Sequence, residues 1–211
     1  EGAQGMSLDV DFGLYPHTTS SNTIAGQIYA GSGIGCNKPI KIIGVAKAYV
    51  SRVGASPFIT ELEEQQAKEL RDKGQEYGAT TGRPRRVGWL DLVQLRQTVR
   101  VSGLTDLALM KLDILAGMPK IKVCVAYDID GEKITEMPAS LTKIRRAKPI
   151  YEILPGWEEF NLEKRAEILI RGYDALPDNV KKFIEFIEGR VSCPITIISF
   201  GPKRDQTIVR E

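Results

Sequence analysis

Short apolar runs alternate with helix-like segments along this chain, and this alternation limits the folds it can adopt. Residues 40–50 form an apolar run whose β-branched side chains suit a buried strand, and residues 61–74 predict a polar helix that ends at a glycine. Residues 92–99 show helical spacing, and the strand-like stretch 104–115 follows them. Helices between apolar strands favour a mostly parallel sheet with helices on its faces.

Two further signals lie in the second half of the chain. Asp130 and Gly131 can supply the positive φ angles of a tight turn between two strand-like runs, which predicts an antiparallel hairpin. Apolar residues from Val180 to Val191 follow helical spacing, and the strand-like run 194–199 comes after them. The expected class is α/β, with a mostly parallel central sheet and flanking helices as in P-loop NTPases, plus one antiparallel hairpin.

The amino end and the composition restrict the class of protein. The chain begins on a turn of small residues of the kind that follows a strand, which leads us to expect an incomplete domain. A net charge of +2 argues against a general binder of nucleic acid. Cys36, Cys124 and Cys193 have neither disulfide nor zinc spacing, and no signal-peptide or membrane-span pattern occurs. We therefore expect reduced thiols, a cytoplasmic location, and neither membrane nor nucleic-acid partners.

The stretch 78–89, GATTGRPRRVGW, gathers three arginines on one short loop. An arginine is always charged, and its planar fork of N–H donors matches a carboxylate or a phosphate. The loop therefore suits an anion, although three arginines beside a turn can also form a solvated face.

In parallel sheets, ligands bind at the carboxyl ends of the strands. Lys111 and Asp113 end one apolar run, and the Asp113 carboxylate can accept hydrogen bonds from N1–H and the 2-amino group of guanine, a pair that adenine lacks. The lysine stem can cover the purine face. Ser199, Phe200 and Gly201 end another run, where backbone groups can close over a base. Taken singly, these are also ordinary strand ends and turns.

Eight ordered blocks carry a resemblance to a known family. They are EGAQG, YPHTTSSNT, AKAYVSRVGASPF, GATTGRPRRVGWLD, KLDIL, IKVCVAY, PIYEILPGW and ISFGP. In this order they resemble the carboxyl-terminal half of adenylosuccinate synthetase, with residues 1–211 forming the carboxyl-terminal part of a single domain. The resemblance implies GTP-dependent joining of IMP and L-aspartate through a 6-phosphoryl-IMP intermediate, in a homodimer.

The resemblance also implies roles for individual residues. IMP contacts fall on Gln4, Thr19, Val53 and Arg83. The loop that receives aspartate comprises Ala79, Thr80, Thr81, Gly82, Arg83, Pro84 and Arg85, with Thr81 and Arg83 meeting the carboxylates. GTP contacts fall on Arg85, Lys111, Leu112, Asp113, Ser199, Phe200 and Gly201, and Arg85 is shared between the aspartate and GTP sides.

The resemblance places the catalytic acid and base, and the ligands of the Mg²⁺ that accompanies GTP, in a glycine-rich half that has no counterpart here. No GDEGKG or Walker-type run occurs, and GSGIGCNK at residues 31–38 is expected to be a turn. His17 has no catalytic role in this interpretation. We thus predict no catalytic residue and no metal ligand in these 211 residues, which alone should bind nucleotides weakly and turn over nothing.

Two alternatives and one departure remain. A noncatalytic guanine-nucleotide-binding module would keep Asp113 and have no use for the arginine loop. A nucleic-acid module would use the arginine loop together with KIRRAK at residues 143–148. Phe200 and Met110 stand where relatives of the family carry other residues, which leaves the detailed shape of the guanine pocket open.

Overall fold

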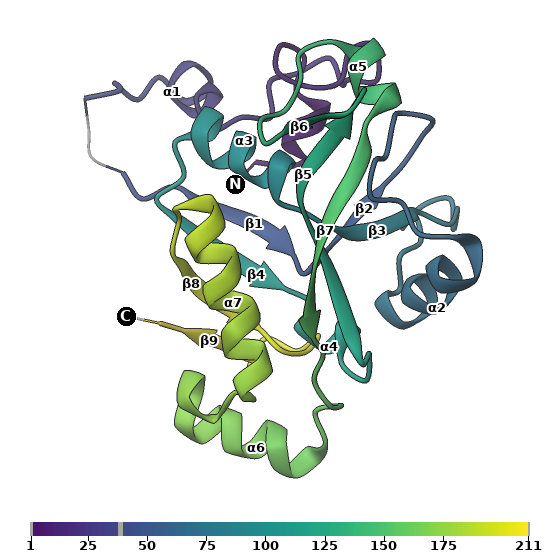
Figure 1. Cartoon of the computed structure of the whole chain (residues 1–211). Helices are drawn as coiled ribbons and strands as arrows, with labels where there is room; N and C mark the ends of the chain where they lie inside the picture. The colour runs from purple at the N-terminus through teal and green to yellow at the C-terminus, as the bar shows by residue number, and fades with distance from the viewer. Residues whose placement is uncertain (1, 38–39, 211) are drawn as a thin grey trace.

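The computed structural model describes residues 2–37 and 40–210, and its strands form two sheets (Figure 1). The first sheet has the order β1-β4-β8-β9. Its strands are β1 (Ile43–Lys47), β4 (Asp106–Met110), β8 (Ile195–Ser199) and β9 (Thr207–Val209). β1, β4 and β8 run parallel, and β9 is antiparallel to β8. The parallel sheet predicted from the alternation of strands and helices is confirmed.

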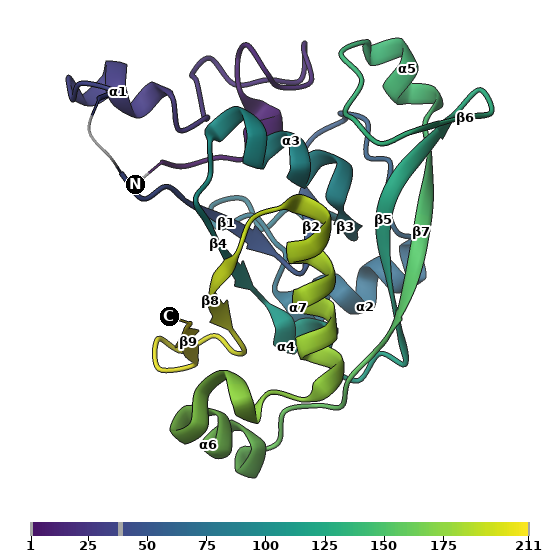
Figure 2. The ribbon, with the colours of Figure 1, turned by 60° about the vertical axis from the view of Figure 1, so that its left-hand side comes forward.

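The second sheet is mixed. It comprises β2 (Tyr49–Arg52), β3 (Arg86–Asp91), β5 (Lys120–Ile129), β6 (Glu132–Ile134) and β7 (Lys148–Pro155). Only β3 and β5 pair in parallel, and Figure 2 shows β5 and β7 as one long antiparallel ribbon. This sheet holds more antiparallel pairing than the single expected hairpin. The hairpin itself is confirmed, because Asp130 (φ 57°) and Gly131 (φ 88°) form the turn between β5 and β6.

The apolar run 40–50 departs from its prediction as one buried strand. It forms two strands, since β1 pairs with β4 as far as Lys47 and β2 pairs with β3 from Tyr49 onward. The N–H of the buried Ala48 between them donates to the Met110 carbonyl at 2.9 Å. β1 lies at the edge of its sheet, and its Val45 side chain is 76% exposed. Pairing with distant strands decides this break, and the local sequence carries no sign of it.

Seven α-helices occur in the part of the chain that the structure describes. They are α1 (Gln27–Ser32), α2 (Glu64–Gly74), α3 (Leu92–Ser102), α4 (Leu112–Leu115), α5 (Leu141–Arg146), α6 (Leu162–Arg171) and α7 (Asp178–Val191). The helices predicted at 61–74, 92–99 and 180–191 are confirmed as α2, α3 and α7, although α2 begins three residues later. α3 begins after Asp91, whose carboxylate accepts from the N–H groups of Val93 and Gln94.

The main core lies where α3 and α7 meet the two sheets. α7 contacts α3 and β7 in the region between the first sheet and the β5–β7 ribbon (Figure 2). Its buried side chains, among them Phe183, Ile184 and Ile187, belong to one cluster with β4 and β8. Within the described residues, no helix combines the length and apolar character needed to cross a bilayer. The packing fixes β1, β4 and β8 side by side, so their carboxyl ends form one edge.

Candidate functional site

Lys111 and Asp113 follow directly on the buried strand β4. Lys111 has a φ of 69° and caps α4, so the chain turns sharply and presents Asp113 in the first helical turn. Asp113 is half-buried, and this burial raises the pKa of its carboxyl group above the ordinary value. Its carboxylate makes no ion pair or hydrogen bond to another side chain within residues 2–37 and 40–210. A polar ligand can therefore engage it.

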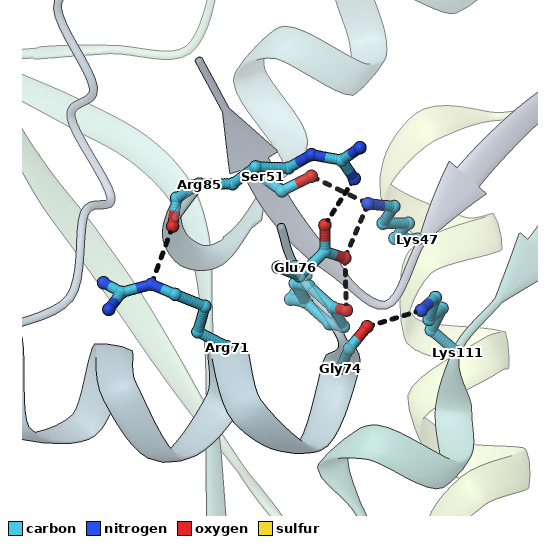
Figure 3. Close-up of polar contacts among 8 residues, drawn as sticks. Lys47, Ser51, Arg71, Gly74, Glu76, Arg85 and Lys111 are labelled. Atoms are coloured by element: carbon cyan, nitrogen blue, oxygen red, sulfur yellow. Dashed lines mark hydrogen bonds and ion pairs between the residues drawn. The ribbon is translucent and has the colours of Figure 1, made fainter. Parts of the chain in front are cut away.

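A turn after α2 carries a buried carboxylate at the centre of the site (Figure 3). The side chain of Glu76 is 1% exposed and accepts three hydrogen bonds. Its Oε1 accepts from Lys47 Nζ and from the Tyr49 hydroxyl, each at 2.6 Å, and its Oε2 accepts from Arg85 Nη1 at 2.9 Å. Lys47 is the last residue of β1 and also donates to Ser51 Oγ at 2.7 Å.

These contacts determine the charge states. Burial by itself raises the pKa of Glu76, but the hydrogen bonds from Lys47, Tyr49 and Arg85 and the charge of Lys47 hold it at about 2. Burial, with the charges of Arg85 and Lys111, lowers the pKa of Lys47 despite Glu76. Burial, Glu76 and the charge of Asp113 raise the pKa of Tyr49. Tyr49 is thus close enough to both Glu76 and Asp113 to sense their charges.

The predicted aspartate loop is closed at its base by backbone hydrogen bonds. Gly78 N–H donates to the Arg83 carbonyl, and Gly82 N–H donates to the Gly78 carbonyl, both at 2.8 Å. Residues 79–83 are exposed, and Gly82 takes a φ of 63° that favours glycine. Arg83 makes no side-chain hydrogen bond or ion pair to the described residues, whereas Arg85 is tied to Glu76.

The same arginines bear on the nucleic-acid alternative. Arg86 pairs with Glu61 and donates to the Ser56 carbonyl at 2.7 Å, and in the second basic stretch Arg146 pairs with Asp130 at 3.1 Å. Arg85 pairs with Glu76. Arg85, Arg86 and Arg146 thus have carboxylate partners, whereas Arg83 has none among the described residues. The three paired cations are less available to a phosphate backbone, which weakens the nucleic-acid alternative.

The turn that begins at Gly74, the last residue of α2, contacts both the end of β4 and the arginine loop. Lys111 Nζ donates to the Gly74 carbonyl at 2.7 Å, two residues before Glu76 (Figure 3). The close packing of this turn requires glycine, since a Cβ on Gly74 would lie 2.5 Å from the Tyr49 hydroxyl oxygen. One short turn thus contacts Lys111 through its backbone and Arg85 through the Glu76 side chain.

Ser199, Phe200 and Gly201 lie at the carboxyl end of β8. The Ser199 hydroxyl donates to the Gly201 carbonyl at 2.9 Å, and Phe200 is fully buried against Phe160. A Cβ on Gly201 would lie 3.2 Å from Arg165 Nη1, and the charge of Arg165 also acts on Asp113. The side chains of Ser199 and Phe200 are therefore engaged internally, and the Phe200 N–H donates to the Gln206 carbonyl at 3.1 Å.

The three remaining predicted IMP residues lie near the amino-terminal segment. Gln4 is exposed with a φ of 72°, Val53 is 70% exposed after β2, and Thr19 N–H donates to the Leu8 carbonyl at 2.8 Å. Arg52 donates to Ser7 Oγ, which ties the segment to β2.

A cavity of about 370 Å³ lies between this segment and β1–β2. Its lining includes Gly5, Ser7, Lys47, Tyr49 and Ser51. Lys47 and Tyr49 therefore face both this cavity and Glu76.

Lys47, Tyr49 and Glu76 have no role in the sequence analysis. Lys47 ends β1, but the break that follows it has no local sequence signal, so its place at a strand end could not be predicted. Glu76 gives no local signal, because a charged residue after a helix is ordinary and its side-chain partners lie at least nine positions away.

The described residues offer no evident place for a metal. No three His, Cys, Asp or Glu side chains gather in residues 2–37 and 40–210, and both carboxylate oxygens of Glu76 are engaged by donors. These residues therefore do not fit a magnesium site. His17 Nε2 is buried without a partner in the same part of the chain. Residues 31–37 end α1 and form a turn, and Lys38 lies outside the described residues.

Comparison with known proteins identifies the family of the chain. The sequence profile described as adenylosuccinate synthetase matches residues 1–208. The adenylosuccinate synthetase of Staphylococcus epidermidis is 50% identical over 212 residues, covering 100% of this chain and 48% of the relative. That of Lactobacillus acidophilus is 51% identical over 209 residues, covering 99% and 47%.

A solved structure agrees as well. The fully ligated adenylosuccinate synthetase from Plasmodium falciparum superposes with a TM-score of 0.91 at 39% identity, covering 100% of this chain and 49% of the other. The chain spans about half the length of the relatives it matches. From its sequence and its fold, the chain belongs to the adenylosuccinate synthetase family.

Proposed function

We propose that the protein containing these residues joins IMP and L-aspartate with GTP, giving adenylosuccinate, GDP and phosphate. The phosphoryl group of GTP passes to the 6-oxygen of IMP, and the aspartate amine then displaces that oxygen as phosphate. Membership of the family supports this reaction. The observation that carries it to this chain is the half-buried, unpaired Asp113 carboxylate on the same edge as Arg85.

Guanine recognition falls to Lys111 and Asp113 in this proposal. The ionised carboxylate of Asp113 accepts from N1–H and the 2-amino group, and adenine would leave it unpaired. Lys111 lays its stem along the base while its ammonium group stays on the Gly74 carbonyl. Leu112 and the backbone of Ser199, Phe200 and Gly201 border the base.

The aspartate and IMP sides fall to the loop 79–85 and the amino-terminal segment. Thr81 and the unpaired, exposed Arg83 meet the aspartate carboxylates, while Arg85, fixed by Glu76, faces both aspartate and the GTP phosphates. Gln4 reaches the hypoxanthine ring, Thr19 the IMP phosphate and Val53 the ribose region, and Arg83 also lies near IMP. The cavity beside Gly5 and Lys47 supports a ligand on this side.

The acid, the base and the ligands of Mg²⁺ come, in this proposal, from residues outside this chain. Bound with GTP, Mg²⁺ would neutralise phosphate charge. A homodimer and a cytoplasmic location complete the proposal, and the three free cysteines are consistent with a reducing compartment.

An omission assay on the whole protein containing these residues tests the proposal. We expect adenylosuccinate, detected by mass spectrometry, only when GTP, IMP and aspartate are all present, and far less when ATP replaces GTP. A protein that binds GTP but forms no product, and whose binding is unchanged by Arg83→Ala or Arg85→Ala, would instead be the noncatalytic guanine-nucleotide-binding module.

A further inference from the structure

Glu76 is a charged residue in the interior that holds three other side chains. A buried carboxylate must be paired, and each of its oxygens needs a hydrogen-bond donor. Oε1 of Glu76 accepts from Lys47 and Tyr49, and Oε2 accepts from Arg85. The resemblance to the family assigns no role to Glu76.

Arg85 is held at three points. Its N–H donates to the Glu76 carbonyl at 2.9 Å, its carbonyl accepts from Arg71 Nε at 2.9 Å, and its Nη1 donates to Glu76 Oε2 at 2.9 Å. Only the last contact fixes the guanidinium group, whose other N–H donors stay available to a ligand because the side chain is one-third exposed. Arg83, two residues earlier, has no such anchor among the described residues.

The turn that carries Glu76 also holds the guanine side. Gly74 offers its carbonyl to Lys111 Nζ at 2.7 Å, so Gly74, Glu76, Arg85 and Lys111 form one hydrogen-bonded unit (Figure 3). Lys111 depends on the backbone of this unit, whereas the guanidinium of Arg85 depends on the Glu76 side chain. A change of the Glu76 side chain should therefore weaken the interaction of Arg85 with its ligands and leave guanine recognition by Lys111 unchanged.

We propose that Glu76 is a positioning residue that fixes the Arg85 guanidinium for aspartate and phosphate, while the turn from Gly74 to Glu76 holds Lys111 in the same unit. The inference rests on the proposed function. Preorganisation of this kind removes the cost of ordering a long side chain when the substrate binds.

A double-mutant cycle on the whole protein tests this inference. We expect Glu76→Gln to lower kcat/KM for aspartate by roughly 10- to 100-fold, because a misplaced catalytic contact of about 1 Å can cost that much. Arg85→Lys should lower it at least as far, since lysine lacks the planar fork. In the Arg85→Lys background, Glu76→Gln should cost less than about threefold, because Glu76 acts through Arg85.

Selectivity and a matched control give two further readouts. The preference for GTP over ATP should stay within about twofold in Glu76→Gln, since Lys111 is held by a backbone carbonyl. Glu61→Gln breaks the pair with the next arginine, Arg86, and should leave kcat/KM within about twofold. If Glu76→Gln is insoluble, the cycle is run with Lys47→Met in every variant, which removes the cation left without a counter-charge.

The outcomes are distinct. A strongly non-additive cycle with intact guanine selectivity supports the inference. Additive losses, or equal losses for aspartate and for guanine selectivity, overturn it and leave Glu76 a purely structural residue while the proposed function stands. Failure of the unsubstituted protein to form adenylosuccinate would overturn the proposed function, and the inference with it.

Discussion

Gly74 and Tyr49 approach so closely that a methyl group on Gly74 would lie 2.5 Å from the Tyr49 hydroxyl oxygen. That hydroxyl donates to Glu76 at 2.6 Å. The close approach of Gly74 and Tyr49 therefore helps to hold the hydrogen-bonded unit that joins Lys111 to Arg85.

We expect Gly74→Ala to lower the free energy of unfolding by about 1–3 kcal/mol, because the added carbon must displace Tyr49 or the turn. Gly189→Ala is the matched control in α7, where a Cβ meets nothing within 4 Å. It should stabilise the chain by about 0.5–1 kcal/mol, since alanine is the better helix former. Urea unfolding measures both, and equal effects of the two changes would contradict the packing described.

The pH dependence of the free energy of unfolding should reveal the contribution of ionised Glu76. Its pKa of about 2 in the folded protein lies below its ordinary value of 4.5, so its contribution is present above pH 4.5 and is lost as the pH falls toward 2. A shift of this size corresponds to about 3 kcal/mol.

The difference in free energy of unfolding between the unsubstituted chain and Glu76→Gln should therefore shrink between pH 5 and pH 2.5. Glu158→Gln, at an exposed position, serves as the control and should show no such trend. A difference that stays constant over this interval would mean that Glu76 is not held ionised by its partners.

Substitution of Asp113 should change which base the protein prefers. An asparagine keeps one acceptor but places an N–H₂ group against the 2-amino group of guanine, so affinity for GTP should fall about 10- to 100-fold. Xanthosine triphosphate, which carries a 2-oxygen, should gain relative to GTP. Competitive nucleotide binding measures the ratio, with the exposed Asp205→Asn as control. An unchanged ratio of the two affinities would mean that the base binds away from Asp113.

The 211-residue chain by itself should bind guanine nucleotide weakly and form no adenylosuccinate. Asp113, Lys111 and the loop 79–85 lie in this chain, whereas the described residues hold no cluster suited to a metal. Isothermal titration with GDP and a coupled product assay on the same sample examine both halves of this statement. Turnover by this chain would refute it.

The sequence predicted the elements that depend on local chemistry. The turn at Asp130 and Gly131 formed as expected because both residues accept positive φ, and α3 and α7 followed their apolar spacing. The division of residues 40–50 between two sheets could not be read locally. Its cause is the pairing of Lys47 with Met110 and of Tyr49 with Trp89, partners 40 or more positions away.

In the candidate site, too, some residues could be predicted from the sequence and others could not. Lys111 and Asp113 were predicted from their place at the end of an apolar run and the arginine loop from its cluster of charge, while the resemblance implied that the loop receives aspartate. Glu76 was missed because its meaning comes from Lys47, Tyr49 and Arg85, which only the folded chain brings to it. The residues proposed to bind substrate at strand ends leave a signal in the sequence, whereas the contacts of the proposed positioning residue Glu76 form only in the folded chain.

The most direct measurement is a crystal structure of the whole protein with GDP, IMP and an unreactive aspartate analogue. We expect the two Asp113 carboxylate oxygens to lie about 3 Å from the guanine N1 and 2-amino nitrogens. We also expect the Arg85 guanidinium to keep its hydrogen bond to Glu76 and to face the analogue. A guanine base bound away from the end of β4, or an analogue bound away from residues 79–85, would contradict it.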